Sequence, residues 1–326
     1  MDIFIPTLNQ MGLLFLFIII GYILAKCKFI PENSASVLSK LENFVLIPAS
    51  VLATFMRQFT VDKLGESGMF FIAGFATILI SIPVSMLVAR ICSKDSYIRK
   101  IYTYGIAFSN FGFMGYAVVK GVFPSVYSNY LVFVIPFWML IYVWGVPTLL
   151  IPSNGDKKSF AGRLRAFINP MFIAMIVGMV VGLLFSSRII ALESSGTRLF
   201  LFEAIDKLDA CMSPVAMLLT GMTIAKIDLK STFTKASLYI ISAFRLVIIP
   251  LVFIAALFFL PIEYWLKVCI LCVASMPLGL NTIVIPSAYG LDTSEASGMA
   301  LISHLLSCIT IPVIFMLFSF LVPGAV

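Results

Sequence analysis

The chain has 326 residues, of which 61% are hydrophobic and only 11% are charged. Soluble domains carry about 25% charged residues, so this composition excludes an ordinary soluble protein and favours an integral membrane protein. The net charge of +7 is explained by basic residues in the loops, and it does not indicate nucleic-acid binding.

Ten stretches are apolar and long enough to cross a bilayer as helices, which need about 20 residues each. Transmembrane barrels have strands of about half this length with alternating polarity, so we expect an all-α membrane protein. The first stretch lacks a basic region and a cleavage site, which predicts a retained span and not a signal peptide. In chain order the predicted spans are residues 5–25, 37–56, 67–91, 101–121, 127–150, 169–188, 200–224, 236–260, 265–289 and 295–322.

Basic residues are unevenly distributed over the loops. The loops after the first, third, fifth and seventh spans hold twice as many Lys and Arg residues as the opposite loops. The positive-inside rule places the basic loops in the cytoplasm and therefore both termini outside. The loop after the ninth span is the exception, since it offers Asp292 and Glu295 but no base.

A polar loop near the centre divides the chain into two halves of five spans that resemble each other. Glu42 precedes Pro48 in the second span as Asp209 precedes Pro214 in the seventh. An odd number of spans in each half means that the second copy enters the membrane from the opposite side, an arrangement typical of secondary transporters. We predict a first five-helix repeat at 1–151, a cytoplasmic linker at 152–168 and an inverted second repeat at 169–326.

The fourth and ninth spans are interrupted near their middles, at 109–115 and at 275–282. Broken helices are costly in hydrocarbon, because the freed backbone groups find no water there. Paired breaks in two corresponding halves indicate a transporter binding site. If the breaks cross at mid-membrane, two helix N-termini converge and form an anion site that needs no basic side chain. Two kinked helices packed through small residues are the alternative.

The candidate substrate-binding residues lie in these two interruptions. Asn supplies both a donor and an acceptor, Gly permits close approach to the backbone, and Pro keeps a helix open. We expect backbone N–H groups near Ser109, Gly112, Gly279 and Thr282 to hold the charge of the substrate. The full candidate set is Ser109, Asn110, Gly112, Gly115, Ser275, Pro277, Gly279, Asn281 and Thr282.

Four ionisable residues within spans are candidates for coupling or ion pairing, because such groups are costly in a membrane. Glu42 and Asp209 occupy equivalent positions, but both lie near span ends, where a solvated face is the alternative. Arg245 either pairs with one of these carboxylates, helps to hold an anion, or extends toward the membrane surface. His304 is the only histidine; an interhelical hydrogen-bond donor is favoured over a proton relay.

At the two interruptions the sequence resembles the auxin efflux carrier family, which includes bacterial small-acid carriers and plant auxin exporters. The resemblance rests on Asn110, Met114 and Gly115 in the fourth span and on Pro277 and Gly279 in the ninth. It continues through Asn281, Thr282, Tyr289, Gly290 and Asp292. Plant members have Pro where this chain has Ser109, so the first break is expected to be the less sharp one.

The resemblance implies ten helices, a scaffold made of spans 1, 2, 6 and 7, and a crossover domain that moves like an elevator. It implies mono- or dicarboxylate substrates such as malate, malonate or an auxin-like acid. We therefore expect a transporter of the cytoplasmic membrane and not an enzyme, with a cation/proton antiporter as the alternative. Neither a cofactor nor a metal is expected, and the acid carried, the direction, proton coupling and a homodimer through the scaffold stay open.

Overall fold

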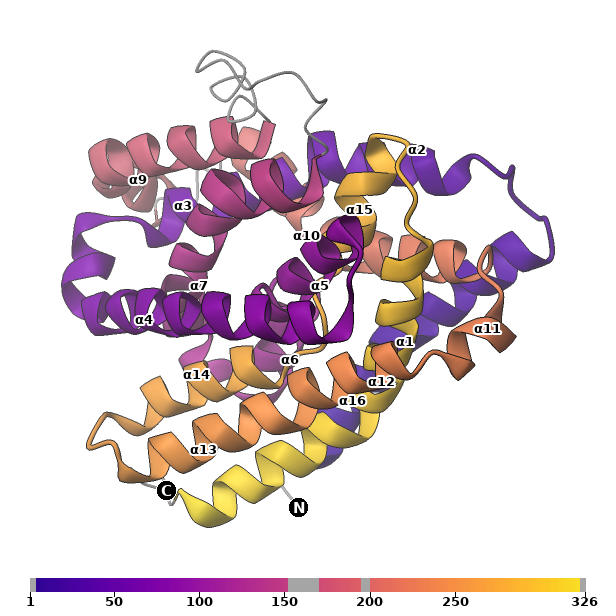
Figure 1. Ribbon diagram of the computed structural model, residues 1–326. Helices are drawn as coiled ribbons and strands as arrows, with labels where there is room; N and C mark the ends of the chain where they lie inside the picture. The colour runs from indigo at the N-terminus through magenta and orange to yellow at the C-terminus, as the bar shows by residue number, and fades with distance from the viewer. Residues whose placement is uncertain (1–3, 152–169, 195–199, 323–326) are drawn as a thin grey trace, which may run out of the picture.

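The computed structural model describes residues 4–151, 170–194 and 200–322 (Figure 1). Within these residues every regular element is a helix and no strand occurs, so the all-α prediction is confirmed for this part of the chain. The first half contains α1 (Phe4–Lys26), α2 (Ser34–Leu41), η1 (Glu42–Leu46), α3 (Ile47–Gln58), α4 (Val61–Cys92), α5 (Ser96–Ala107), α6 (Gly115–Val122), η2 (Pro124–Val126), α7 (Tyr127–Leu140) and η3 (Ile141–Leu150). The second half contains α9 (Pro170–Ser194), α10 (Phe200–Ile224), α11 (Leu229–Thr234), α12 (Ala236–Ala243), η4 (Phe244–Ile248), α13 (Ile249–Phe259), α14 (Tyr264–Ser275), α15 (Asn281–Ala288) and α16 (Ser294–Leu321).

Among the described residues, six helical stretches are long and apolar enough to cross a membrane. They are Phe4–Lys26, Ser34–Gln58, Val61–Cys92, Pro124–Leu150, Ala236–Phe259 and Ser294–Leu321. The fourth and ninth predicted spans are not among them because each is divided into two short helices, α5 with α6 and α14 with α15. The chain is therefore a multi-pass membrane protein.

Two of the spans change their helical pitch shortly before a proline. In η1 the N–H of Ile47 bonds to the carbonyl of Glu42, and in η4 the N–H of Ile249 bonds to the carbonyl of Phe244. Pro48 and Pro250 follow directly. A proline ring pushes the preceding turn away, and one π-helical turn absorbs the displacement without ending the helix. These turns hold Glu42 and Arg245.

The most extensive helix contacts fall into two groups, and Figure 1 shows α9 and α3 at the upper left and α13, α14 and α16 at the bottom. In the first group α1 packs along α10, and α3 packs along both α9 and α10. In the second group α4 packs on α5 and α7, while α16 packs on α12 and α13, and α13 packs on α14. Of the broken helices, α5 and α14 belong to the second group, whereas α6 packs mainly on α1 and α15 mainly on α2.

Loops far apart in sequence gather on one face of the protein. Lys226 Nζ donates to the Glu32 carbonyl at 2.8 Å, and Tyr97 OH donates to the Asp292 carbonyl at 2.8 Å. Glu295 pairs with Lys235 at 2.8 Å. The acidic loop after the ninth predicted span therefore lies beside basic residues of neighbouring loops.

Candidate functional site

Both predicted interruptions are present. The helical path stops at Ala107 and resumes at Gly115, and it stops again at Ser275 and resumes at Asn281. The expectation that the first break would be the lesser one is wrong, since 108–114 is longer than 276–280. A proline beside Asn110 is not required, because contacts from other helices hold this segment open.

The two interruptions cross and are hydrogen-bonded to each other through their backbones. The Asn110 N–H donates to the Pro277 carbonyl at 2.9 Å, and the Gly279 N–H donates to the Gly105 carbonyl at 3.1 Å. A Cβ atom on Gly279 would lie 2.0 Å from the Phe108 carbonyl oxygen. Only glycine fits there, because the obstacle is backbone and cannot rotate away.

Three consecutive N–H groups in the first break donate no hydrogen bond to any other described residue. They belong to Phe111, Gly112 and Phe113, and successive free N–H groups form concavities that bind anions. The expectation for Gly279 and Thr282 needs correction, because both N–H groups are occupied, that of Thr282 by the Gly279 carbonyl at 3.3 Å. Free donors lie in both breaks, since the N–H groups of Leu278, Leu280 and Asn281 in the second break also donate no hydrogen bond to a described residue.

The Asn110 side chain has a fixed orientation. His304 Nδ1 lies 2.8 Å from the Ala300 carbonyl oxygen, which can only accept, so Nδ1 carries the hydrogen. Nε2 is then the acceptor for Asn110 Nδ2 at 3.0 Å. His304 is thus an interhelical acceptor and not the donor expected. Asn110 Oδ1 is buried and has no partner among the described residues.

Asn281 mirrors this arrangement in the second break. Its Nδ2 donates to Tyr104 OH at 2.9 Å, and its Oδ1 is buried without a described partner. Asn110 and Asn281 line a common cavity of about 10 Å³. A single water needs about 10–15 Å³, so the crossing is closed and must open to admit a ligand.

The other predicted site residues serve mainly to shape the breaks. Thr282 Oγ1 donates to the Gly279 carbonyl at 2.7 Å, and Ser109 Oγ donates to the Val273 carbonyl at 3.0 Å. Gly112 packs against the Trp138 ring. Ser275 Oγ is buried without a described partner.

Arg245 lies at the crossing and is only 2% exposed. Its Nε donates to the Met276 carbonyl at 2.9 Å, its Nη1 to the Ile106 carbonyl at 3.3 Å, and its Nη2 to the Val273 carbonyl. The predicted pairing with a carboxylate is wrong for the described residues, where Arg245 enters no ion pair. Extension to the membrane surface is excluded by its burial.

The two carboxylates at equivalent sequence positions have different surroundings. Glu42 is completely buried, and neither of its carboxyl oxygens has a described partner. Asp209 is half-buried on α10. The solvated alternative is therefore wrong for Glu42. Neither residue lines the cavity at the crossing.

Sequence reasoning missed four residues that contact the breaks. Tyr104 bonds Asn281, Trp138 packs on Gly112, and Tyr130 OH donates to the Phe111 carbonyl at 3.1 Å. Ser213 on α10 donates to the Phe113 carbonyl. Tyr and Trp residues usually lie at the membrane interfaces. Their occurrence in the middle of predicted spans was therefore the sequence signal that could have indicated these contacts.

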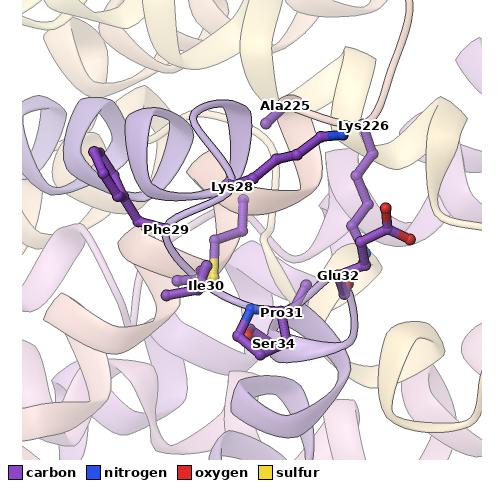
Figure 2. Close-up of a pocket in the computed structure, with 11 residues that line it drawn as sticks. Lys28, Phe29, Ile30, Pro31, Glu32, Ser34, Ala225 and Lys226 are labelled. Atoms are coloured by element: carbon purple, nitrogen blue, oxygen red, sulfur yellow. Dashed lines mark hydrogen bonds between the residues drawn. The ribbon is translucent and has the colours of Figure 1, made fainter.

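A larger cavity lies elsewhere, on the face where the loops gather (Figure 2). It measures about 740 Å³ and is lined by the end of α1, the start of α2 and the end of α10. Figure 2 shows Lys28, Lys226 and Glu32 around it. None of its lining residues lines the crossing, and the described residues contain no cluster of metal-binding side chains.

Comparisons with known proteins agree with this architecture. The profile of a family described as membrane transport protein matches residues 6–315. A protein of Methanothermobacter thermautotrophicus described as an uncharacterized transporter is 25% identical over 297 residues, which cover 90% of this chain and 93% of the relative.

Proposed function

The chain belongs to the membrane transport protein family, the auxin efflux carrier family, and we propose that it is a secondary active transporter of small organic anions. The substrate is a mono- or dicarboxylate, such as malate, malonate or an auxin-like acid, held where the two interrupted helices cross. The transporter acts in the cytoplasmic membrane, with both termini outside. The uneven distribution of basic loop residues supports that orientation.

The observation that carries this proposal is the hydrogen-bonded crossing of the two interruptions. The unpaired N–H groups of residues 111–113 and the N-termini of α6 and α15 favour a negative charge. The unpartnered amide oxygens of Asn110 and Asn281 accept from a hydroxyl, N–H or protonated carboxyl group of the same substrate. A hydroxy acid satisfies both sets of groups.

Ten spans in two inverted repeats are part of the proposal, and the packing of the first group supports them. If spans 1 and 2 correspond to spans 6 and 7, then the pair α1–α10 corresponds to the pair α9–α3. Both pairs approach closely at glycines: a Cβ on Gly21 would lie 2.1 Å from the Leu218 carbonyl oxygen, and one on Gly182 would lie 2.5 Å from that of Phe59. The repeats are residues 1–151 and 169–326, with 152–168 as linker.

Elevator-like movement is part of the proposal, with α1, α2, α3, α9 and α10 as the scaffold, and the two packed groups support it. The scaffold packs on the broken helices through α1 against α6 and α2 against α15, and two hydroxyl groups bond across this boundary: Ser39 Oγ donates to the Val284 carbonyl and Ser213 Oγ to the Phe113 carbonyl. Hydrogen bonds of this kind contribute only about 0.5–1.5 kcal/mol each, so they can exchange as the moving domain slides. The scaffold surface is also where a homodimer would form.

A cation/proton antiporter is the second candidate, and Glu42 is the observation that favours it. Its carboxyl group is completely buried without a described partner, as expected of a group that binds and releases a proton. Glu42 could also couple protons to transport in the anion carrier. In that case Glu42→Gln removes the pH dependence of acid transport and leaves acid binding intact. An antiporter would instead move cations without any dependence on added carboxylate.

Thermal stabilisation and counterflow test the proposal together. The purified protein is heated with malate, malonate or indole-3-acetate, and proteoliposomes are then tested for counterflow of the stabilising acid. We expect stabilisation by at least one acid and saturable counterflow. Absence of both, or cation exchange that is indifferent to every acid, would reject the anion carrier.

A further inference from the structure

Arg245 occupies a position that the proposed transport mechanism has not yet used. The residue comes from η4, outside both interruptions, yet its guanidinium reaches both of them. It binds carbonyls at the C-terminal end of α14, in the second break, and at the C-terminal end of α5. These carbonyls are the ones that a broken helix leaves without intrahelical partners.

The crossing has four helix ends whose charges would otherwise cancel. Each helix terminus carries about half an elementary charge, positive at the N-terminus and negative at the C-terminus. The C-terminal ends of α5 and α14 therefore sum to about −1, and the N-terminal ends of α6 and α15 sum to about +1. Without a further charge the four ends sum to zero, so the attraction of the two N-terminal ends for an anion is opposed by the two C-terminal ends nearby.

The guanidinium changes this balance. Arginine stays charged in proteins, and Arg245 has no carboxylate partner among the described residues. Its single positive charge matches the combined negative charge of the two C-terminal ends that it contacts. We propose that Arg245 determines the charge preference of the crossing by neutralising these two ends, so that the N-terminal ends of α6 and α15 attract a carboxylate.

A second observation indicates a ligand at the crossing. Asn110 and Asn281 both line the cavity between the breaks, and each has a buried amide oxygen without a described partner. The contacts of Arg245 are instead made to carbonyls on the C-terminal side of each break. Arg245 is thus a positioning residue that acts through the helix ends. This inference rests on the proposed transport of organic anions.

The fork of arginine suits this role. Its three nitrogen atoms each donate to a different carbonyl oxygen, two at the end of α14 and one at the end of α5. A lysine ammonium is instead a compact point charge. Lysine would retain the charge and lose part of the hydrogen bonding. Glutamine would retain some hydrogen bonding and lose the charge. The two substitutions therefore separate charge from geometry.

The test compares each acid with its uncharged amide. Dissociation constants are measured with purified protein for malate, malonate and indole-3-acetate and for malamide, malonamide and indole-3-acetamide. The ratio of amide to acid dissociation constants reports charge preference, which a loss of folded protein alone does not alter. For the acid that binds best we expect Arg245→Gln to lower this ratio by about tenfold or more, which corresponds to about 1.4 kcal/mol.

Arg245→Lys should keep the ratio within about threefold of wild type, a difference below 1.4 kcal/mol. Arg90→Gln is the matched control, since Arg90 is exposed at the end of α4 and its loss should leave the ratio unchanged. A wild-type ratio in Arg245→Gln, or a loss of the preference for the acid over the amide in Arg245→Lys, would overturn this inference and leave the proposed function standing. If Arg245→Gln does not fold, the Arg245→Lys ratio decides. Wild-type protein that binds none of the acids would overturn the proposed function and this inference with it.

Discussion

Arg245 contacts both interruptions, but the one in the second half also contains a proline and a closely packed glycine of its own segment, whereas the one in the first half has no proline and is held by further side chains from other helices. In the second, Pro277 lacks an N–H and Gly279 permits contact with the Phe108 carbonyl. In the first, the Phe111 carbonyl is bound by Tyr130 from α7 and the Phe113 carbonyl by Ser213 from α10.

The same geometry, an interrupted helix, is thus favoured by nearby residues in one case and by tertiary contacts in the other. A break caused by proline and glycine forms wherever its sequence is placed. A break held by distant hydroxyl and imidazole groups depends on how the surrounding helices are packed. Because three consecutive unpaired N–H groups, those of residues 111–113, lie in the first break, part of the proposed ligand-binding surface belongs to a segment that helix movement can reshape.

The largest effect is expected at the point where the two breaks touch. Gly279→Ala places a Cβ atom 2.0 Å from the Phe108 carbonyl oxygen, so the backbones must separate. Overpacking of this kind costs about 1–3 kcal/mol of unfolding free energy, and a displacement of about 1 Å lowers activity by about 100-fold. Transport in proteoliposomes and thermal unfolding check both effects.

Gly65→Ala is the control for that substitution. A Cβ on Gly65 has nothing within 4 Å, and transport should stay at the wild-type level. Equal effects of the two substitutions would show that the crossing has no special sensitivity.

Pro277→Ala should have a smaller effect. Alanine is favoured over proline in a helix interior by about 3 kcal/mol, which promotes closure of the second break. Gly279 and the two contacts of Arg245 with the Val273 and Met276 carbonyls oppose that closure. We expect transport to fall by about tenfold, as for a loss of about 1.4 kcal/mol. The exposed Pro83→Ala in α4 is the control, and wild-type transport by Pro277→Ala would contradict local control of this break.

His304→Gln tests tertiary control of the first break. Glutamine retains an acceptor for Asn110 Nδ2 but loses the Nδ1 contact to Ala300. Loss of one hydrogen bond of about 0.5–1.5 kcal/mol lowers substrate affinity by about threefold. The pH profile of uptake should keep its shape, because the ring acts as a neutral acceptor. A shifted profile would instead identify His304 as a proton relay.

The smallest effect is expected for Ser213→Ala. This change removes one donor to the Phe113 carbonyl and weakens the contact between α10 and the first break by about 0.5–1.5 kcal/mol. Amide hydrogen exchange in 108–114 should accelerate by a few-fold. Ser319→Ala, which removes an exposed hydroxyl bonded within α16, is the control, and equal exchange in both variants would contradict the role of Ser213.

The sequence predicted the features that depend on local chemistry. Apolar runs predicted the helices, and proline, glycine and asparagine predicted both breaks and the presence of Asn110 and Asn281 in them. Partners from distant helices could not be predicted, because local periodicity carries no information about them. The carbonyl contacts of Arg245 and the acceptor role of His304 are of this kind.

Counterflow of a labelled dicarboxylate by wild type and by Asn281→Ala tests the central claim most directly. Asn281 lines the crossing, and its side chain bonds to Tyr104, so the alanine variant should insert and unfold normally while saturable malate or malonate counterflow is lost. Undiminished counterflow by Asn281→Ala, at equal protein in the vesicles, would contradict a substrate site between the two interrupted helices.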